Sequence, residues 1–238
     1  MEPNQWKVEK FADIAWEEWV KQVLDLHRIV DAGTIYDPER AQLNEAITAI
    51  LIDGLMPAFL ELKQIRDPKT KSLPILDRQQ PYEDLARKLW KAYKEHMQAA
   101  ACLAGFKIGF LFDDEKKFNA GVEAFCKANP NLRAGFQKFL EETRQSWQND
   151  LSSFRNKWLE HPIGDRSKYD KFYTPEYAEA IFEAVWMAIV DIMAILLELK
   201  LQPGVRLVEQ HPDDPGPKWA QRFRFDHPAF RKLEWRRR

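Results

Sequence analysis

The chain has 238 residues, of which 45% are hydrophobic and 31% are charged, and its formal net charge is −1. These values are typical of a globular protein with enough apolar residues for a sizeable core, and they exclude a collagen-like or largely disordered chain. Because the net charge is close to zero, we expect no general attraction to polyanions, so a nucleic-acid site would have to be a local basic patch.

The cysteine and histidine pattern argues against metal and cofactor chemistry. Only Cys102 and Cys126 are present, and they form no CxxC pair, which favours a reducing, cytoplasmic location. No histidine follows a glutamate by three residues, the spacing found in di-iron helical bundles, and there is no glycine-rich phosphate loop. Residues 1–10 are polar and lack the apolar core of a signal peptide. We therefore expect no metal and no cofactor.

Apolar residues at helical spacing predict long amphipathic helices in the first half of the chain. The first is expected over 11–30, and the second over 37–66 with a kink at Pro57. Several prolines over 67–81 indicate a surface connection, and a third helix is expected over 82–106.

The second half begins with an ambiguous stretch at 107–112, followed by a short predicted helix over 115–127. Asn129 with Pro130 is then expected to cap a long helix, whose apolar stripe steps by three or four residues as far as Trp158. Pro162 disfavours helical geometry at the residue before it, so this helix should stop at or before His161.

A basic loop at 163–173 leads to a final helix over 177–201, capped by Thr174 with Pro175. This helix is apolar around most of its circumference, so it should be buried within its own bundle or against a second copy. Acidic residues along it make a membrane span unfavourable. The remaining residues, 202–238, are rich in proline and in basic and aromatic side chains, and they would either fold back onto the bundle or bind RNA.

These segments predict an all-α protein. Residues 1–201 would form one helical bundle of about five to six helices, and residues 202–238 would form a Pro-rich, basic C-terminal tail. We expect no membrane association.

The most distinctive chemistry lies where the long helix ends, in Arg155-Asn156 and His161. A histidine titrates near neutrality and can move a proton to or from a ribose hydroxyl. An arginine keeps its charge and can bind two phosphate oxygens in a planar fork, and Asn156 could orient either group. Attack of a 2′-hydroxyl on its own phosphate needs neither a metal nor a protein nucleophile, so these residue types suit RNA cleavage.

The spacing imposes a geometric condition on this site. His161 lies six residues after Arg155, which on an unbroken α-helix places the side chains roughly a third of a turn and about 9 Å apart. They would meet one phosphate only if the helix ended between them or if a second chain contributed. Pro162 favours the first condition, and the apolar last helix favours the second.

The pattern Arg155-Asn156-x4-His161 resembles the motif of HEPN domains (higher eukaryotes and prokaryotes nucleotide-binding), which consists of an arginine, a polar residue, a gap of four to six residues and a histidine. The resemblance covers roughly 82–201 as a pattern and three residues as a motif. Pro162 departs from the small or aromatic residue expected after the histidine.

The resemblance implies a metal-independent endoribonuclease, of the kind found in toxin–antitoxin or phage-defence systems, that acts as a homodimer with a composite site. Arg155 and His161 would be catalytic, Asn156 would support them, and the products would carry a 2′,3′-cyclic phosphate. The implied partners are single-stranded RNA, a second copy of the chain, and an antitoxin or defence protein.

Basic and aromatic residues near the motif are candidate RNA contacts, because RNA grooves combine phosphate-binding cations with stacking rings. The candidates are Lys157, Arg166, Lys168, Tyr169 and Lys171. Asp165 and Asp170 dilute this charge, and a plain solvated loop accounts for the same residues. The alternative to catalysis is a helical interaction or nucleotide-binding module, in which Arg155 forms only a surface ion pair.

Overall fold

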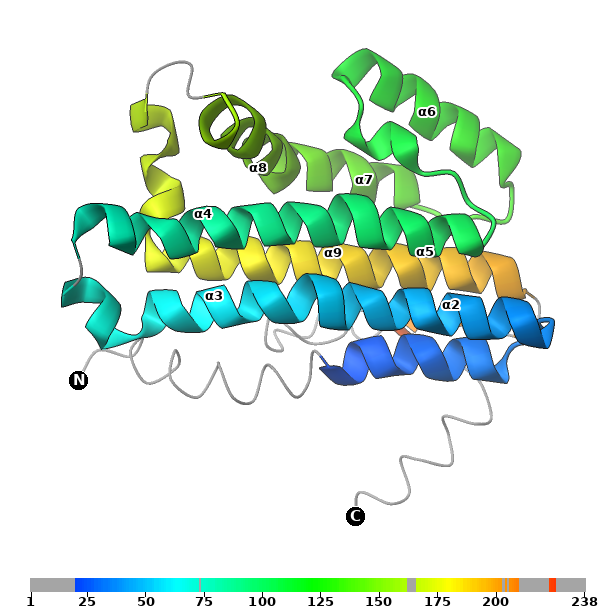
Figure 1. Cartoon of the computed structure of the whole chain (residues 1–238). Helices are drawn as coiled ribbons and strands as arrows, with labels where there is room; N and C mark the ends of the chain where they lie inside the picture. The colour runs from blue at the N-terminus through cyan, green and yellow to red at the C-terminus, as the bar shows by residue number, and fades with distance from the viewer. Residues whose placement is uncertain are drawn as a thin grey trace.

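The computed structural model describes residues 20–72, 74–161, 166–202, 204, 206–209 and 223–225. Apart from a short pair of strands near the C-terminus, these residues form an all-α helical bundle (Figure 1), as the sequence predicted. Residues 20–32 are helical, which agrees with the second part of the helix expected over 11–30; residues 11–19 lie outside the described part.

Most helices are joined end to end through π-helical turns, in which hydrogen bonds connect residue i to i+5. The first such rod consists of α2 (Asp37–Ala49), η1 (Ile50–Leu55) and α3 (Met56–Arg66). The second consists of α4 (Ile75–Lys91), η3 (Ala92–His96) and α5 (Met97–Leu103). The third consists of α7 (Phe136–Thr143), η5 (Arg144–Gln148), α8 (Asn149–Ser153) and η6 (Phe154–Leu159).

Shorter elements connect these rods, and a single long helix completes the bundle. Three 3-10 helices, η2 (Pro68–Ser72), η4 (Gly109–Phe112) and η7 (Arg166–Tyr173), lie in the connections, and α6 (Glu115–Ala128) precedes the third rod. The long helix is α9 (Pro175–Leu201), and its predicted cap is confirmed, since the Tyr177 backbone N–H donates to the Thr174 hydroxyl at 3.3 Å.

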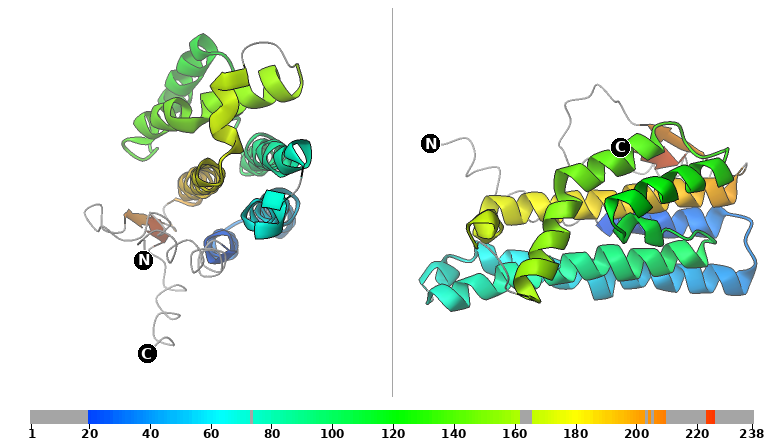
Figure 2. Two further views of the ribbon diagram at one scale, coloured as in Figure 1. Left: turned by 90° about the vertical axis from the view of Figure 1, so that its left-hand side faces the viewer. Right: turned by 90° about the horizontal axis from the view of Figure 1, so that it is seen from above.

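The central helix is α9, which packs against α3, α4, α5 and η7. Seen end-on, α9 runs alongside the α2–α3 and α4–α5 rods, while α6 to α8 lie across one side of them (Figure 2). Every residue over 188–198 is buried. The apolar circumference of α9 is therefore covered by the chain itself. Of the two environments expected for this helix, its own bundle and a second copy, the structure shows the first.

In the described part of the chain, two helices are long and apolar enough to cross a membrane, namely Asp37–Arg66 and Pro175–Leu201. Buried core helices of soluble proteins can have the same length and composition. In α9 the most apolar stretch is 78% buried inside the chain.

Acidic side chains of α9 are matched by basic side chains from other elements. Glu179 accepts a hydrogen bond from Arg66 at 2.7 Å, and the buried Glu198 accepts two from Arg133 at 3.2 and 3.3 Å. Paired in this way, charged groups can lie in a core helix without the cost of an isolated buried charge.

The proline-rich connection is shorter than predicted, because α4 begins at Ile75 and contains Pro81 within it. The prediction that this helix starts at residue 82 was therefore wrong. A proline inside a helix removes one backbone donor and usually costs stability. Here Pro81 is buried, and burial of its apolar ring acts against that cost.

The predicted N-cap at Asn129 was also wrong. Asn129 instead ends α6, and its side-chain amide donates to the Phe125 carbonyl at 2.8 Å. The next helix begins only at Phe136, after Gly135 adopts a left-handed conformation with φ +85°. Proline after an asparagine is compatible with both a helix start and a helix stop, and the pattern alone did not separate them.

Within the predicted tail, the structure describes a short antiparallel pair of strands. β1 (Leu207–Glu209) pairs with β2 (Phe223–Phe225), with Leu207 opposite Phe225. β1 lies against α9. Residues 210–222 and 226–238 lie outside the described part.

Candidate functional site

The motif lies at the end of the third rod, as predicted. Arg155 and Asn156 are in η6, which ends at Leu159, so helical structure stops before His161. All three side chains are at least partly accessible, and His161 is exposed.

A π-helical turn sets the direction of Arg155. The Glu160 backbone N–H donates to the Arg155 carbonyl at 3.1 Å, an i to i+5 hydrogen bond. On an α-helix, residues five apart would lie about 140° apart around the axis, but the wider π turn brings them onto one side. Arg155 Nη2 consequently reaches Glu160 Oε1 at 2.5 Å.

Asn156 holds the other terminal nitrogen of the same guanidinium. Arg155 Nη1 donates to Asn156 Oδ1 at 2.9 Å, and Asn156 Nδ2 donates to the Ser152 hydroxyl at 3.3 Å. The guanidinium is thus held between an amide and a carboxylate. Asn156 therefore lies beside Arg155, in a position from which its side chain can orient the guanidinium.

His161 directly follows the carboxylate that binds Arg155. The imidazole is exposed, and among the described residues it has no hydrogen-bond partner. It is therefore accessible to an external ligand, at the same helix end as the Arg155–Glu160 pair.

An aromatic cluster anchors this helix end to η7. Phe154 is fully buried and stacks on Phe172, with ring centroids 4.1 Å apart and an interplanar angle of 5°. Tyr169 packs against both Phe154 and Trp158, with centroids 5.6 and 6.1 Å away. Aromatic rings in contact have preferred relative orientations, so these contacts hold η6 in a defined position against η7.

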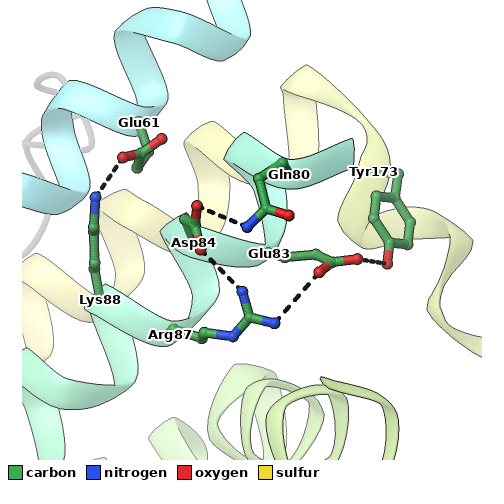
Figure 3. Close-up of polar contacts among 7 residues, drawn as sticks. All are labelled: Glu61, Gln80, Glu83, Asp84, Arg87, Lys88 and Tyr173. Atoms are coloured by element: carbon green, nitrogen blue, oxygen red, sulfur yellow. Dashed lines mark hydrogen bonds and ion pairs between the residues drawn. The ribbon is translucent and has the colours of Figure 1, made fainter. Parts of the chain in front are cut away.

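Hydrogen bonds extend from the same helix end to α4. The indole Nε1 of Trp158 donates to the Tyr173 hydroxyl at 2.9 Å. That hydroxyl in turn donates to Glu83 on α4 at 3.0 Å (Figure 3). Arg87 lies between Glu83 and Asp84 and donates to them at 3.4 and 2.9 Å. Gln80 also donates to Asp84, while Lys88 pairs with Glu61 on α3.

Sequence reasoning did not identify this network. Glu83 and Tyr173 are ninety positions apart, and no local pattern in the sequence connects them. Only the packing of η6 and η7 on α4 brings these side chains together.

Some of the predicted RNA contacts are exposed, and others already contact side chains of the protein itself. Lys157 and Lys168 are exposed, whereas the Tyr169 hydroxyl lies 3.0 Å from the Ser153 hydroxyl and its ring is packed in the aromatic cluster. Lys171 Nζ binds Asp150 at 2.5 Å. Arg166 begins η7, and its side chain lies outside the described part.

Lys171 is held in its charged form. Burial by itself would lower the pKa of Lys171, but the hydrogen bond to Asp150 and the proximity of Tyr177 raise it above its usual value. The ammonium therefore contributes to holding η7 on α8, and a phosphate would have to compete with Asp150 for it.

Over the described residues, no group of three or more His, Cys, Asp and Glu side chains is arranged to hold a metal ion. No family model, curated protein or solved structure matches this chain. A function therefore has to be argued from the residues at this helix end and their geometry.

Proposed function

We propose that the chain is a metal-independent endoribonuclease similar to HEPN ribonucleases, acting on single-stranded RNA. One observation carries the proposal. The π turn at the end of the long helix directs the Arg155 guanidinium to Glu160, immediately before the exposed His161. A permanent cation and a titratable imidazole thus occupy one accessible helix end.

In the proposed reaction the ribose supplies the nucleophile. His161 takes the proton of the 2′-hydroxyl, the 2′-oxygen bonds to phosphorus, and the P–O5′ bond breaks. Arg155 binds the non-bridging phosphate oxygens and stabilises the charge that develops there. The leaving 5′-oxygen is protonated by a second imidazole or by water. The products carry a 2′,3′-cyclic phosphate and a 5′-hydroxyl.

The proposal includes a homodimer, in which the helix end of one copy faces that of the other. Two imidazoles would then be available, one as base and one as acid. A toxin or phage-defence role in the cytoplasm, with an antitoxin or defence partner, is part of the same proposal and rests on the resemblance to HEPN proteins.

A second candidate function is a non-catalytic interaction module. The observation that favours it is that both terminal nitrogens of Arg155 already have acceptors within the chain, at Asn156 and Glu160. In this case the motif would only stabilise a helix end.

Cleavage of labelled single-stranded RNA in EDTA separates the two functions. The ribonuclease proposal expects cleavage by the wild type, and a loss of at least about a hundredfold in His161→Ala and in Arg155→Ala. Lys138→Ala is the matched control, because Lys138 is exposed on the same rod and pairs only loosely with Glu142, at 3.6 Å. Equal rates in wild type and His161→Ala, or no cleavage by folded wild type, would favour the interaction module.

A further inference from the structure

Glu160 is a feature of the helix end that the proposed reaction does not use. Its carboxylate binds Arg155 Nη2, while Asn156 binds Nη1. A phosphate held in a planar fork requires two N–H groups of one guanidinium and brings its own negative charge. Glu160 therefore occupies part of the surface that a phosphate would bind.

The contact depends on the π turn. Were η6 a regular α-helix, the five-residue spacing would direct Glu160 away from Arg155. The π turn instead brings the Glu160 carboxylate into contact with the Arg155 guanidinium, next to His161. π-helical turns are frequently located at functional sites, and this one brings a carboxylate onto the cation of the motif.

We infer that Glu160 is a built-in competitor of the RNA phosphate at Arg155, an inference that rests on the proposed function. In the free protein its carboxylate holds the guanidinium, and RNA binds by displacing it. Glu160 thereby weakens binding of phosphates that make no further contacts and favours a strand long enough to engage the neighbouring surface as well.

The exposure of the pair makes displacement feasible. The side chains of Arg155 and Glu160 are 30% and 43% exposed, and ion pairs in contact with water are weak and screened by salt. A deeply buried pair would resist opening, because breaking it leaves an unpaired charge in the core. Glu160 therefore lowers affinity without closing the site.

The test measures binding of a 2′-O-methyl single-stranded RNA oligonucleotide, which cannot undergo 2′-hydroxyl attack, at low salt. Glu160→Gln should bind about fivefold more tightly than the wild type, which corresponds to about 1 kcal/mol for an exposed pair. Glu142→Gln is the charge-matched control, because Glu142 is 62% exposed on the same rod and does not pair with Arg155. It should change affinity by much less.

A double-mutant comparison assigns the effect to Arg155. In an Arg155→Ala background, Glu160→Gln should alter the affinity no more than Glu142→Gln does. If both glutamine variants bind equally in the wild-type background, the gain is one of net charge and the inference is overturned. The inference is also overturned if Glu160→Gln binds RNA with the same affinity as the wild type.

These outcomes are distinguishable from a failure of the proposed function. If wild-type binding and cleavage both depend on Arg155 but are insensitive to Glu160→Gln, the ribonuclease proposal stands and the competitor role is wrong. If neither the wild type nor Glu160→Gln binds or cleaves RNA, both are wrong.

Discussion

Phe154 is the residue that holds the motif in place. It precedes Arg155 at the end of the long helix, is fully buried, and stacks on Phe172 of η7. The sequence predicted its position on the apolar stripe, since it continues the three- and four-residue steps from Leu140 and Leu151. Its partners could not be predicted, because Phe172 and Tyr169 lie in a segment expected to be a basic loop, either in contact with RNA or simply solvated.

Phe154→Ala should destabilise the protein by about 3–5 kcal/mol, because it removes a buried ring and leaves a cavity. Phe154→Leu, which retains most of the apolar volume, should cost clearly less. Urea denaturation followed by circular dichroism gives both values. A cost below about 1 kcal/mol for the alanine variant would show that the ring does not fix η6 against η7.

The buried position of His96 leads to a prediction of how the stability of the fold depends on pH. Its Nε2 is buried without a hydrogen-bond partner in the described structure, and burial, assisted by Lys91, lowers the pKa of His96 below its usual value. The unfolded chain therefore protonates His96 more readily than the folded chain does. As a result, the free energy of unfolding should fall as the pH drops below about 6.5, the usual histidine pKa. The decline should level off once the pH is below the lowered pKa of His96 in the folded protein.

Denaturation midpoints measured between pH 7.5 and pH 5 test this expectation. His96→Gln should lose part of the decline seen in the wild type, because glutamine takes up no proton. Parallel pH profiles for the two proteins would contradict the assignment to His96.

Among the helices, the first two rods meet at their π-helical turns. Gly54 in η1 lies against Ala92 in η3, and a Cβ at Gly54 would be 2.9 Å from the Ala92 Cβ and 3.2 Å from its Cα. Such distances require the helices to move apart. The glycine is therefore needed for the close approach of the rods, although it is unfavourable for helix formation.

Gly54→Ala should destabilise the bundle by about 1–2 kcal/mol, since overpacking outweighs the roughly 1 kcal/mol that alanine gains in helix propensity. In combination with Ala92→Gly, part of that cost should be recovered, giving a favourable coupling energy in a double-mutant cycle. Thermal or urea unfolding of the four proteins measures it. A stabilising Gly54→Ala would show that the rods are not in close contact there.

Helix ends were predictable where their chemistry is unambiguous. Thr174 with Pro175 marks a start in both sequence and structure. Asn129 with Pro130 and the prolines before residue 82 are compatible with more than one local structure, and there tertiary packing decided. The π turns left no signal in the sequence. A surface ion pair of Arg155 was expected as the alternative to catalysis, but its partner, Glu160, could not be predicted without the π turn.

In the complete bundle, α9 is enclosed by the chain itself. Its apolar surface therefore gives no reason to expect a second copy against it. The proposed dimer instead has to form through the exposed end of the third rod, where His161 and Lys157 lie.

Mixing two inactive variants tests whether the site is shared between copies. If the site is composite, Arg155→Ala mixed with His161→Ala should recover part of the activity, because a mixed dimer contains one intact Arg155 and one intact His161. Each variant mixed with itself provides the baseline. No recovery, despite subunit exchange shown by differently tagged chains, would place both residues of a working site on one chain.

The most direct test of ribonuclease activity uses two substrates of identical sequence, one all-ribose and one with 2′-deoxyribose throughout, incubated with the protein in EDTA. We predict that only the ribose substrate is cut, with 2′,3′-cyclic phosphate ends, and that His161→Ala cuts neither. Cleavage of the deoxyribose strand, equal cleavage by His161→Ala, or no cleavage of any RNA by the folded wild type would contradict the proposed mechanism.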